Sequence, residues 1–326
     1  MRIAWRHPTR AAASLAARER HYYPPVSVVI LAYSIAALAL AIQWTAAKIA
    51  LGTIPPFELS TLRFAIASAL FVAAAVVMRT PLPLRRWRPV AAAAAFGFLG
   101  FNGLAFLGLH LTPASDSALI VPTTIPVATA LLATLIRERL SAQKLRGFAV
   151  ASAGAAIVII GGQQIGGELS GSRVLGDLLE FASALCWAAC LTIGALALRT
   201  ERVLGFVTMA SLLGTAMLFP FGFLEQGYRD VGGWSASSWR AVVVLGVVST
   251  FVAFLIFFWA VRRFGAARGA LISYLAPVAG LFTAFAVLGE RPSALQLIGT
   301  IVILAGVRLV ARRTPETIPS TRATPA

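Results

Sequence analysis

Long apolar runs, each about as long as a membrane-spanning helix, constrain this chain more than any other feature. A bilayer core requires roughly 20 predominantly apolar residues per helix. Residues of the set AVILMFWYC make up 59% of the 326, whereas soluble domains reach about 45–50% even with glycine included. We therefore expect an all-α polytopic membrane protein with ten transmembrane helices. The runs lie at residues 26–47, 57–78, 89–109, 114–136, 146–162, 175–198, 203–224, 240–261, 266–288 and 294–311.

Basic residues lie mainly in short clusters at the ends of the apolar runs. The formal net charge is +16, and Arg and Lys together number 28. If the N-terminus is cytoplasmic, 22 of these 28 bases fall on the cytoplasmic side, as the positive-inside rule requires. We therefore expect an integral protein of a bacterial plasma (inner) membrane with both termini in the cytoplasm. The distribution favours contact with lipid over binding of nucleic acid.

Short segments flank and separate the apolar runs. Residues 1–25 are a basic cytoplasmic tail, for which a surface helix on anionic lipid and plain disorder are both open. Residues 163–174 are expected to be an extracytoplasmic linker. Residues 312–326 are rich in Thr and Pro, and such a composition predicts a disordered tail.

An internal repeat relates the two parts of the chain. Pro126-Val-Ala recurs as Pro277-Val-Ala, and Glu138-Arg recurs as Glu290-Arg, at offsets of 151 and 152 residues. Further matches in the same order follow over about thirty residues, and such self-similarity at a fixed period indicates a duplication.

The duplication predicts two repeats of five helices each, at residues 26–162 and 175–311. Because five is odd, the second repeat enters the membrane from the opposite side. Inverted repeats are typical of secondary transporters, since two related halves can exchange inward-open and outward-open shapes. Carriage of a solute is therefore the function that the sequence favours.

Two stretches carry a resemblance to a known family. Residues 114–140 and residues 265–290 resemble the two EamA-type repeats of the drug/metabolite transporter superfamily. The resemblance covers about residues 26–311 and implies a ten-helix alternating-access carrier, typically an exporter of small metabolites, amino acids or toxic compounds. The first two helices also look like that family, at Trp44, Lys48, Pro56 and Arg63.

Acidic residues are absent from the middle of every expected span. The sequence therefore shows no evident buried carboxylate for coupling transport to protons, although the resemblance would make proton antiport plausible.

Arg63 is the main candidate for substrate binding. It lies inside the second expected span, and a central Arg costs roughly 2.5–3.5 kcal/mol on insertion scales. We expect it to face the bundle interior or a cavity. Snorkelling to the interface, and a structural ion pair with Asp177 or Glu180, are the alternatives.

Two tryptophans and a lysine are further candidates. Lys48 follows Trp44 by one helical turn near the outer end of the first span. Together they would form a cavity rim for an anionic or zwitterionic solute, but both residue types also serve as interfacial anchors. Trp187 in the sixth span is the expected counterpart of Trp44, with core packing as its alternative.

Polar residues within spans complete the candidate substrate site. Unpaired polar groups are costly in a membrane, so these residues either line a cavity or form hydrogen bonds between helices. They are Gln43, Asn102, Ser273 and Tyr274.

Paired prolines and glutamates occupy equivalent places in the two halves. Pro126 and Pro277 are expected to be hinges, because proline removes a backbone donor and clashes with the carbonyl four residues earlier. A static packing kink is the alternative. Glu138 and Glu290 are expected to be structural, satisfying backbone donors at a helix N-terminus.

Other function classes find less support. An intramembrane enzyme would need a nucleophile with a base, or a metal set, and no such motif accompanies the three histidines. We expect no catalytic residues, no metal and no cofactor. A channel and a non-transporting membrane scaffold stay open. The expected partners are a small-molecule substrate and the lipid bilayer, and a homodimer is also open.

Overall fold

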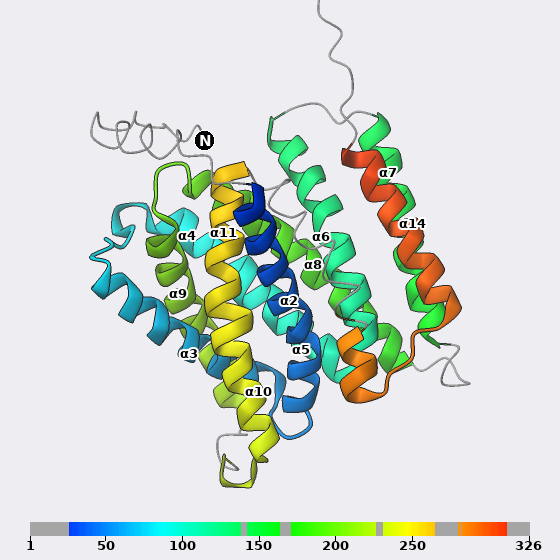
Figure 1. Ribbon diagram of the computed structural model, residues 1–326, viewed down its shortest axis with the longest axis horizontal. Coiled ribbons are helices and arrows are strands. Elements are labelled where there is room, and N and C mark those ends of the chain that lie inside the picture. Colours follow the sequence, from blue (N-terminus) through cyan, green and yellow to red (C-terminus); the bar gives the residue numbers. More distant parts are fainter. Residues whose placement is uncertain are drawn as a thin grey trace, which may run out of the picture.

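The computed structural model describes residues 26–137, 142–163, 171–225, 231–264, 280 and 282–311. Every regular element within these ranges is a helix (Figure 1). Both tails and most of the 163–174 linker lie outside them, as do Glu138, Ser273, Tyr274 and Pro277. The elements are α2 Val26–Ala50, α3 Pro56–Val77, η1 Leu84–Arg86, α4 Trp87–Ala94, η2 Ala95–Gly100, α5 Phe101–Leu111, α6 Ala114–Arg137, α7 Ala142–Gln163, α8 Gly171–Ala197, α9 Val203–Leu224, α10 Ala236–Gly246, η5 Val247–Val252, α11 Ala253–Phe264, η7 Ala284–Leu288 and α14 Ala294–Ala311.

The helices have the length and composition of membrane spans. Within the described residues, six are long and apolar enough to cross a bilayer, and residues 34–50 and 294–306 form shorter apolar helices. The outer surface carries apolar side chains such as Val77, 81% exposed, and Leu224, 74% exposed. Large apolar patches of this kind are rare on soluble monomers. The chain is therefore an integral, polytopic, all-helical membrane protein.

Local sequence signals set several helix ends. Pro56 opens α3, where the missing backbone donor of a first-turn proline costs nothing. Ser235 caps α10 by accepting a hydrogen bond from the Ser238 N–H at 3.1 Å. Gly289 follows η7 with a φ of +72°, a left-handed conformation that glycine adopts without the penalty other residues incur.

Two helices contain a wide π-helical turn at corresponding places. The turn η2 interrupts the helix from α4 to α5, and η5 interrupts the helix from α10 to α11; they begin 152 residues apart. Side chains close both turns. Asn102 Nδ2 donates to the Gly97 carbonyl at 2.9 Å, and Thr250 Oγ1 donates to the Leu245 carbonyl at 2.7 Å, each five residues back. The spacing matches the offset of the sequence repeat.

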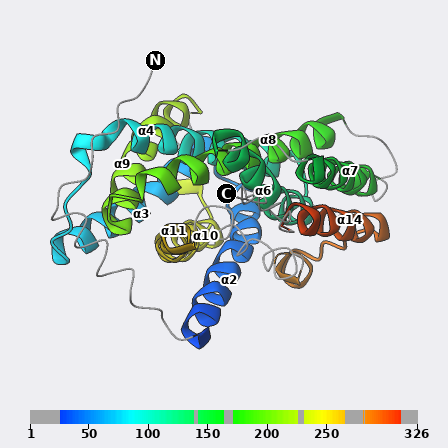
Figure 2. The same cartoon turned by 90° about the horizontal axis from the view of Figure 1, so that it is seen from above.

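Helix pairing follows the same correspondence. In both views α7 lies beside α14 at one side of the molecule, while α3, α4 and α9 gather at the other (Figures 1 and 2). The helix α3 packs on α9, α2 packs on the segment from α10 to α11, and α8 packs on the segment from α4 to α5. Each contact therefore joins an element of one expected half to an element of the other.

Glycine permits the close approach of α7 and α14. A Cβ on Gly154 would lie 2.6 Å from the Ile303 backbone nitrogen, and one on Gly299 would lie 2.8 Å from the Val158 backbone nitrogen. Both distances are far below van der Waals contact, so neither helix can carry a larger residue there without moving away from the other.

Candidate functional site

A narrow cavity lies where the two halves meet near the centre of the bundle. Its volume is about 30 Å³, far below the roughly 300–1,000 Å³ of typical small-molecule pockets. Residues from α2, α5, α6, α8 and α11 enclose it: Leu40, Gln43, Trp44, Phe101, Val121, Pro122, Ile125, Trp187 and Phe254. A metabolite-sized solute therefore needs these walls to separate.

Four of the nine side chains that line the cavity are aromatic. Trp44 and Trp187 come from α2 and α8, the first helix of each expected half, and are 2% and 3% exposed. The Trp187 ring centre lies 4.9 Å from that of Phe101 and 5.2 Å from that of Phe254. The two tryptophans that the sequence singles out thus line one cavity, and its surface suits an apolar or aromatic group.

Gln43 supplies a polar group to this wall and connects it to Arg63. Gln43 Oε1 accepts a hydrogen bond from Arg63 Nη2 at 2.8 Å, and Thr250 Oγ1 accepts one from Arg63 Nε at 2.7 Å. The guanidinium is fully buried, with its carbon 5.2 Å from the Phe64 ring centre and 5.5 Å from that of Phe106.

The Arg63 cation has no carboxylate partner within the part of the chain that the structure describes, and its Nη1 has no hydrogen-bond acceptor there. The ion pair with Asp177 or Glu180 that the sequence left open is not formed. Snorkelling does not occur either, because the side chain is enclosed by protein. Arg63 is therefore a buried, uncompensated cation directly behind the cavity wall.

Lys48 and Asn102 lie apart from the cavity. Lys48 Nζ donates to the carbonyls of Leu109 and Thr112, at 2.7 and 2.5 Å, at the C-terminal end of α5. A cation is favourable there because the last carbonyls of a helix lack partners. Lys48 therefore binds the end of a neighbouring helix. The sequence had suggested that it lines a cavity rim or anchors the protein at the membrane interface. Asn102 is fully buried and closes the π-turn instead of facing the cavity.

Prolines adjoin the cavity on α6. Pro122 lines it, and Pro126 follows one turn later within the same unbroken helix. Nearby hydroxyls donate to the α6 backbone, including that of Thr129, which donates to the Ile125 carbonyl at 2.7 Å. Pro126, the predicted hinge, is not among the residues that line the cavity, whereas Pro122 is.

A cluster of buried carboxylates is the largest departure from the sequence analysis. Asp116 at the start of α6 and Asp177 and Glu180 on α8 are each 0% exposed. Arg173 donates to Asp116 Oδ2 from Nε at 3.0 Å and from Nη2 at 2.7 Å, and Gln296 Nε2 donates to Asp116 Oδ1 at 2.5 Å. Asp116 lies at the start of α6, and Asp177 and Glu180 lie in the N-terminal half of α8. The sequence indicated the α8 pair only as possible partners of Arg63 and gave no signal for a cluster with Asp116.

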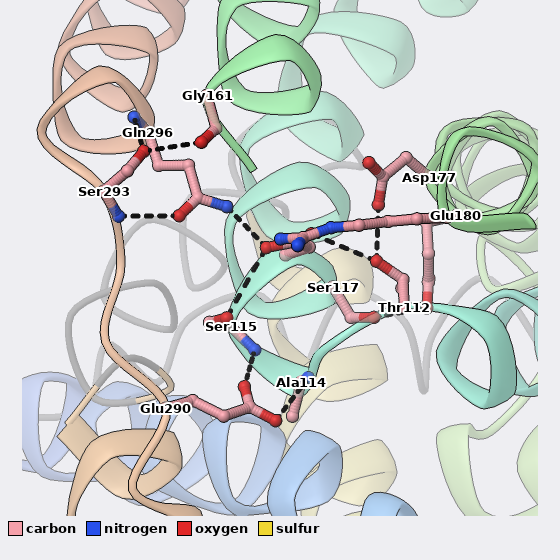
Figure 3. Close-up of polar contacts among 12 residues, drawn as sticks. Thr112, Ala114, Ser115, Ser117, Gly161, Asp177, Glu180, Glu290, Ser293 and Gln296 are labelled. Atoms are coloured by element: carbon pink, nitrogen blue, oxygen red, sulfur yellow. Dashed lines mark hydrogen bonds and ion pairs between the residues drawn. The ribbon is translucent and has the colours of Figure 1, made fainter. Parts of the chain in front are cut away.

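Two further carboxylates cap helices across the boundary between the halves. Glu290 accepts from the backbone N–H groups of Ala114 and Ser115 at 3.1 and 2.7 Å, at the start of α6 (Figure 3). Glu225 accepts from those of Phe57 and Glu58 at 2.8 and 2.9 Å, at the start of α3. Burial raises the pKa of the Glu225 carboxyl, and these two hydrogen bonds partly counter that shift. Polar contacts thus join the halves at the end of the bundle where α3 and α6 begin.

The sequence profile of one family matches most of the chain. The EamA-like transporter family matches residues 27–160 and 174–312. A solved crystal structure superposes with a TM-score of 0.64 at 24% identity, covering 88% of this chain and 99% of the other. At that identity the likeness concerns the fold alone.

Several relatives are named as transporters. An uncharacterized transporter of Archaeoglobus fulgidus is 26% identical over 82% of this chain and 91% of its own. A probable terminal-alkyne amino-acid exporter of Streptantibioticus cattleyicolor is 28% identical over 78% of this chain and 84% of its own. The aromatic amino acid exporter YddG of Ancylobacter novellus is 28% identical over 80% of this chain and 91% of its own.

Proposed function

The chain belongs to the EamA-like transporter family, and on that premise we propose that it is a secondary transporter that exports a small solute by alternating access. The names of the family and of the relatives indicate a transporter and not an enzyme. The observation that carries the proposal is the cavity between Trp44 and Trp187, which both halves enclose.

The cavity favours an amino-acid-like substrate with an apolar or aromatic side chain. Ligand sites are mostly apolar with a few well-placed polar groups, and here the polar groups are Gln43 and, behind it, Arg63. A substrate carboxylate that reached the free Nη1 of Arg63 would compensate its charge. That two relatives are named as amino-acid exporters supports this class.

Ten helices in two inverted five-helix repeats, at residues 26–162 and 175–311, are the architecture that we propose for this mechanism. The π-turns η2 and η5, 152 residues apart, and the exchanged helix pairing support it. Hinges at Pro126 and Pro277 would let the halves move in opposite senses. The distribution of bases supports cytoplasmic termini in the inner membrane, which makes the end where α6 begins extracytoplasmic.

Transport by the purified full chain in proteoliposomes tests this function. Vesicles loaded with unlabelled phenylalanine should accumulate external radiolabelled phenylalanine by exchange, with saturation, and Trp187→Ala should lose this exchange. Glycine is the matched control substrate, because it lacks the side chain that the aromatic walls would contact. Flux that never saturates would identify a channel, and failure of every amino acid tested would favour a scaffold.

A further inference from the structure

Buried charges at the end of the bundle where α6 begins are not balanced. Figure 3 shows this cluster, in which Thr112, Asp177 and Glu180 lie together. The charged groups that act on one another there are Lys48 on α2, Asp116 on α6, Arg173, Asp177 and Glu180 on α8, and Glu290 before α14. Among the described residues the carboxylates therefore outnumber the cations, and uncompensated buried charge is costly.

The hydrogen-bond donors show where a proton must reside. Thr112 Oγ1 lies 3.1 Å from Asp116 Oδ2 and 2.7 Å from Asp177 Oδ1. A hydroxyl has a single proton to donate, whereas an ionised carboxylate only accepts. If both acids were ionised, one of these two close oxygen pairs would have no hydrogen between them.

A neutral Asp177 resolves this conflict. Its Oδ1–H then donates to Thr112, and the Thr112 hydroxyl donates to Asp116, which stays ionised because Arg173 and Gln296 also donate to it. The second Asp177 oxygen, Oδ2, is buried and has no partner within the described part of the chain. A buried oxygen without a partner costs less free energy in a neutral carboxyl group than in a carboxylate.

The contacts of this cluster cross the boundary between the two halves. Asp177 meets Thr112, Glu180 accepts from the Ser117 hydroxyl at 2.5 Å, and Arg173 meets Asp116. In the first two pairs one residue precedes the linker and the other follows it; in the third, Arg173 lies in the last residues of the linker, at the start of α8. Opening of the transporter at this end would separate the pairs and admit water. Because water solvates the ionised carboxylate, Asp177 would then no longer need to be protonated.

We propose that Asp177 is a proton-binding site that holds this end of the transporter closed, so that opening releases one proton. On opening, the Oδ1–H bond breaks, the electron pair stays on the carboxylate, and the proton passes to water. Since uptake and release occur at the same end, the site makes opening depend on the pH at that face without moving protons across the membrane. The inference rests on the alternating-access function proposed above.

Infrared spectroscopy of the purified full chain in nanodiscs tests the proton directly and needs no substrate. The wild type should show C=O stretching bands of protonated carboxyl groups, and the difference spectrum between the wild type and Asp177→Asn should contain one such band. Glu201→Gln is the matched control, because Glu201 lies at the opposite end beside Arg86, and its difference spectrum should contain none. Glu58 and Glu180 are also buried with unpartnered oxygens, so bands that remain in Asp177→Asn belong to them; a difference spectrum of Asp177→Asn without a protonated-carboxyl band would overturn the assignment.

Cysteine accessibility tests the gate. In a Cys186→Ala, Cys190→Ala background, Ser238→Cys places a thiol at a position 1% exposed, where Ser238 contacts Thr53 across the same boundary. If opening releases one proton, the open population should rise about tenfold per pH unit. The maleimide labelling rate of Ser238→Cys should rise with it once it is divided, at each pH, by the rate of a cysteine at the exposed position Gly232, because this ratio cancels the ionisation of the thiol itself.

The variant Asp177→Asn should remove this pH dependence and leave labelling slow, because the Asn amide donates to Thr112 as the protonated acid does. Labelling that follows Na⁺ concentration instead of pH, or that retains its pH dependence in Asp177→Asn, would refute the proposal. If Asp177→Asn does not fold, a comparison of Thr112→Val with Thr112→Ser provides the same test. Only the valine removes the hydroxyl, so only Thr112→Val should flatten the pH dependence of labelling.

Discussion

Replacing Arg63 by Gln separates a substrate-binding cation from a structural one. The variant removes the free Nη1 donor and the positive charge, while its amide can still hydrogen-bond to Thr250 or Gln43. A hydrogen bond to a charged group contributes about 1.5–3 kcal/mol, and each 1.4 kcal/mol changes affinity about tenfold. If Nη1 binds a substrate carboxylate, affinity should therefore fall roughly tenfold to hundredfold.

Stability should change far less in the same variant. Losing the hydrogen bonds of Arg63 destabilises the fold. Removing a buried cation that has no carboxylate partner among the described residues also removes a desolvation penalty of several kcal/mol. These effects are opposed and of similar size. The melting temperature and the folded yield should consequently remain close to those of the wild type.

Two measurements on the same preparation decide the outcome. Phenylalanine exchange in proteoliposomes reports binding and transport, and size-exclusion chromatography with thermal unfolding reports the folded yield. Arg85→Gln is the control, because Arg85 is exposed to solvent. Lost transport with retained yield supports the binding role. A yield that falls in step with transport would show that Arg63 is a structural cation and refute the reasoning.

Three other experiments test the wider architecture. In intact cells a single cysteine at Gly166 should react with impermeant maleimide and one at Leu84, which is 67% exposed, should not; the opposite result would disprove the inverted topology. Pro126→Ala and Pro277→Ala should each slow turnover at unchanged yield and shift the inward-open and outward-open populations, measured by cysteine accessibility, in opposite directions; a shift in one direction would disprove the paired hinges. Gly154→Leu should reduce folded yield, because its side chain would overlap the α14 backbone and overpacking costs about 1–3 kcal/mol; normal yield and melting temperature would contradict the observed packing.

Much of the architecture could be predicted because a membrane imposes strict local rules. In lipid every backbone polar group must be paired within the segment, so a long apolar run predicts a helix wherever it occurs. The predicted run at 57–78 corresponds to α3, Pro56–Val77, and the run at 203–224 corresponds to α9, Val203–Leu224. The family could likewise be predicted, because its motifs are local strings of residues.

The composition of the candidate site depended on contacts between distant segments. Trp44 and Trp187 could be identified as a corresponding pair from the sequence, but their shared cavity wall with Pro122 required the packing of α2, α8 and α6. Lys48 lies one turn from Trp44 and nevertheless extends to the end of α5. The partner of a long side chain depends on which helix end packs within its reach, and the local sequence does not specify that helix.

The sequence by itself determined the membrane-spanning helices, the internal repeat and the family, because apolar length and repeated motifs are properties of contiguous residues. Only the tertiary structure decided which polar groups meet. Asp116 and Asp177 stand near helix ends, where the sequence suggests contact with water, yet both are fully buried. Their burial arises because α5, α6, α8 and α14 converge at one end of the bundle, and such convergence brings together residues that are far apart along the chain.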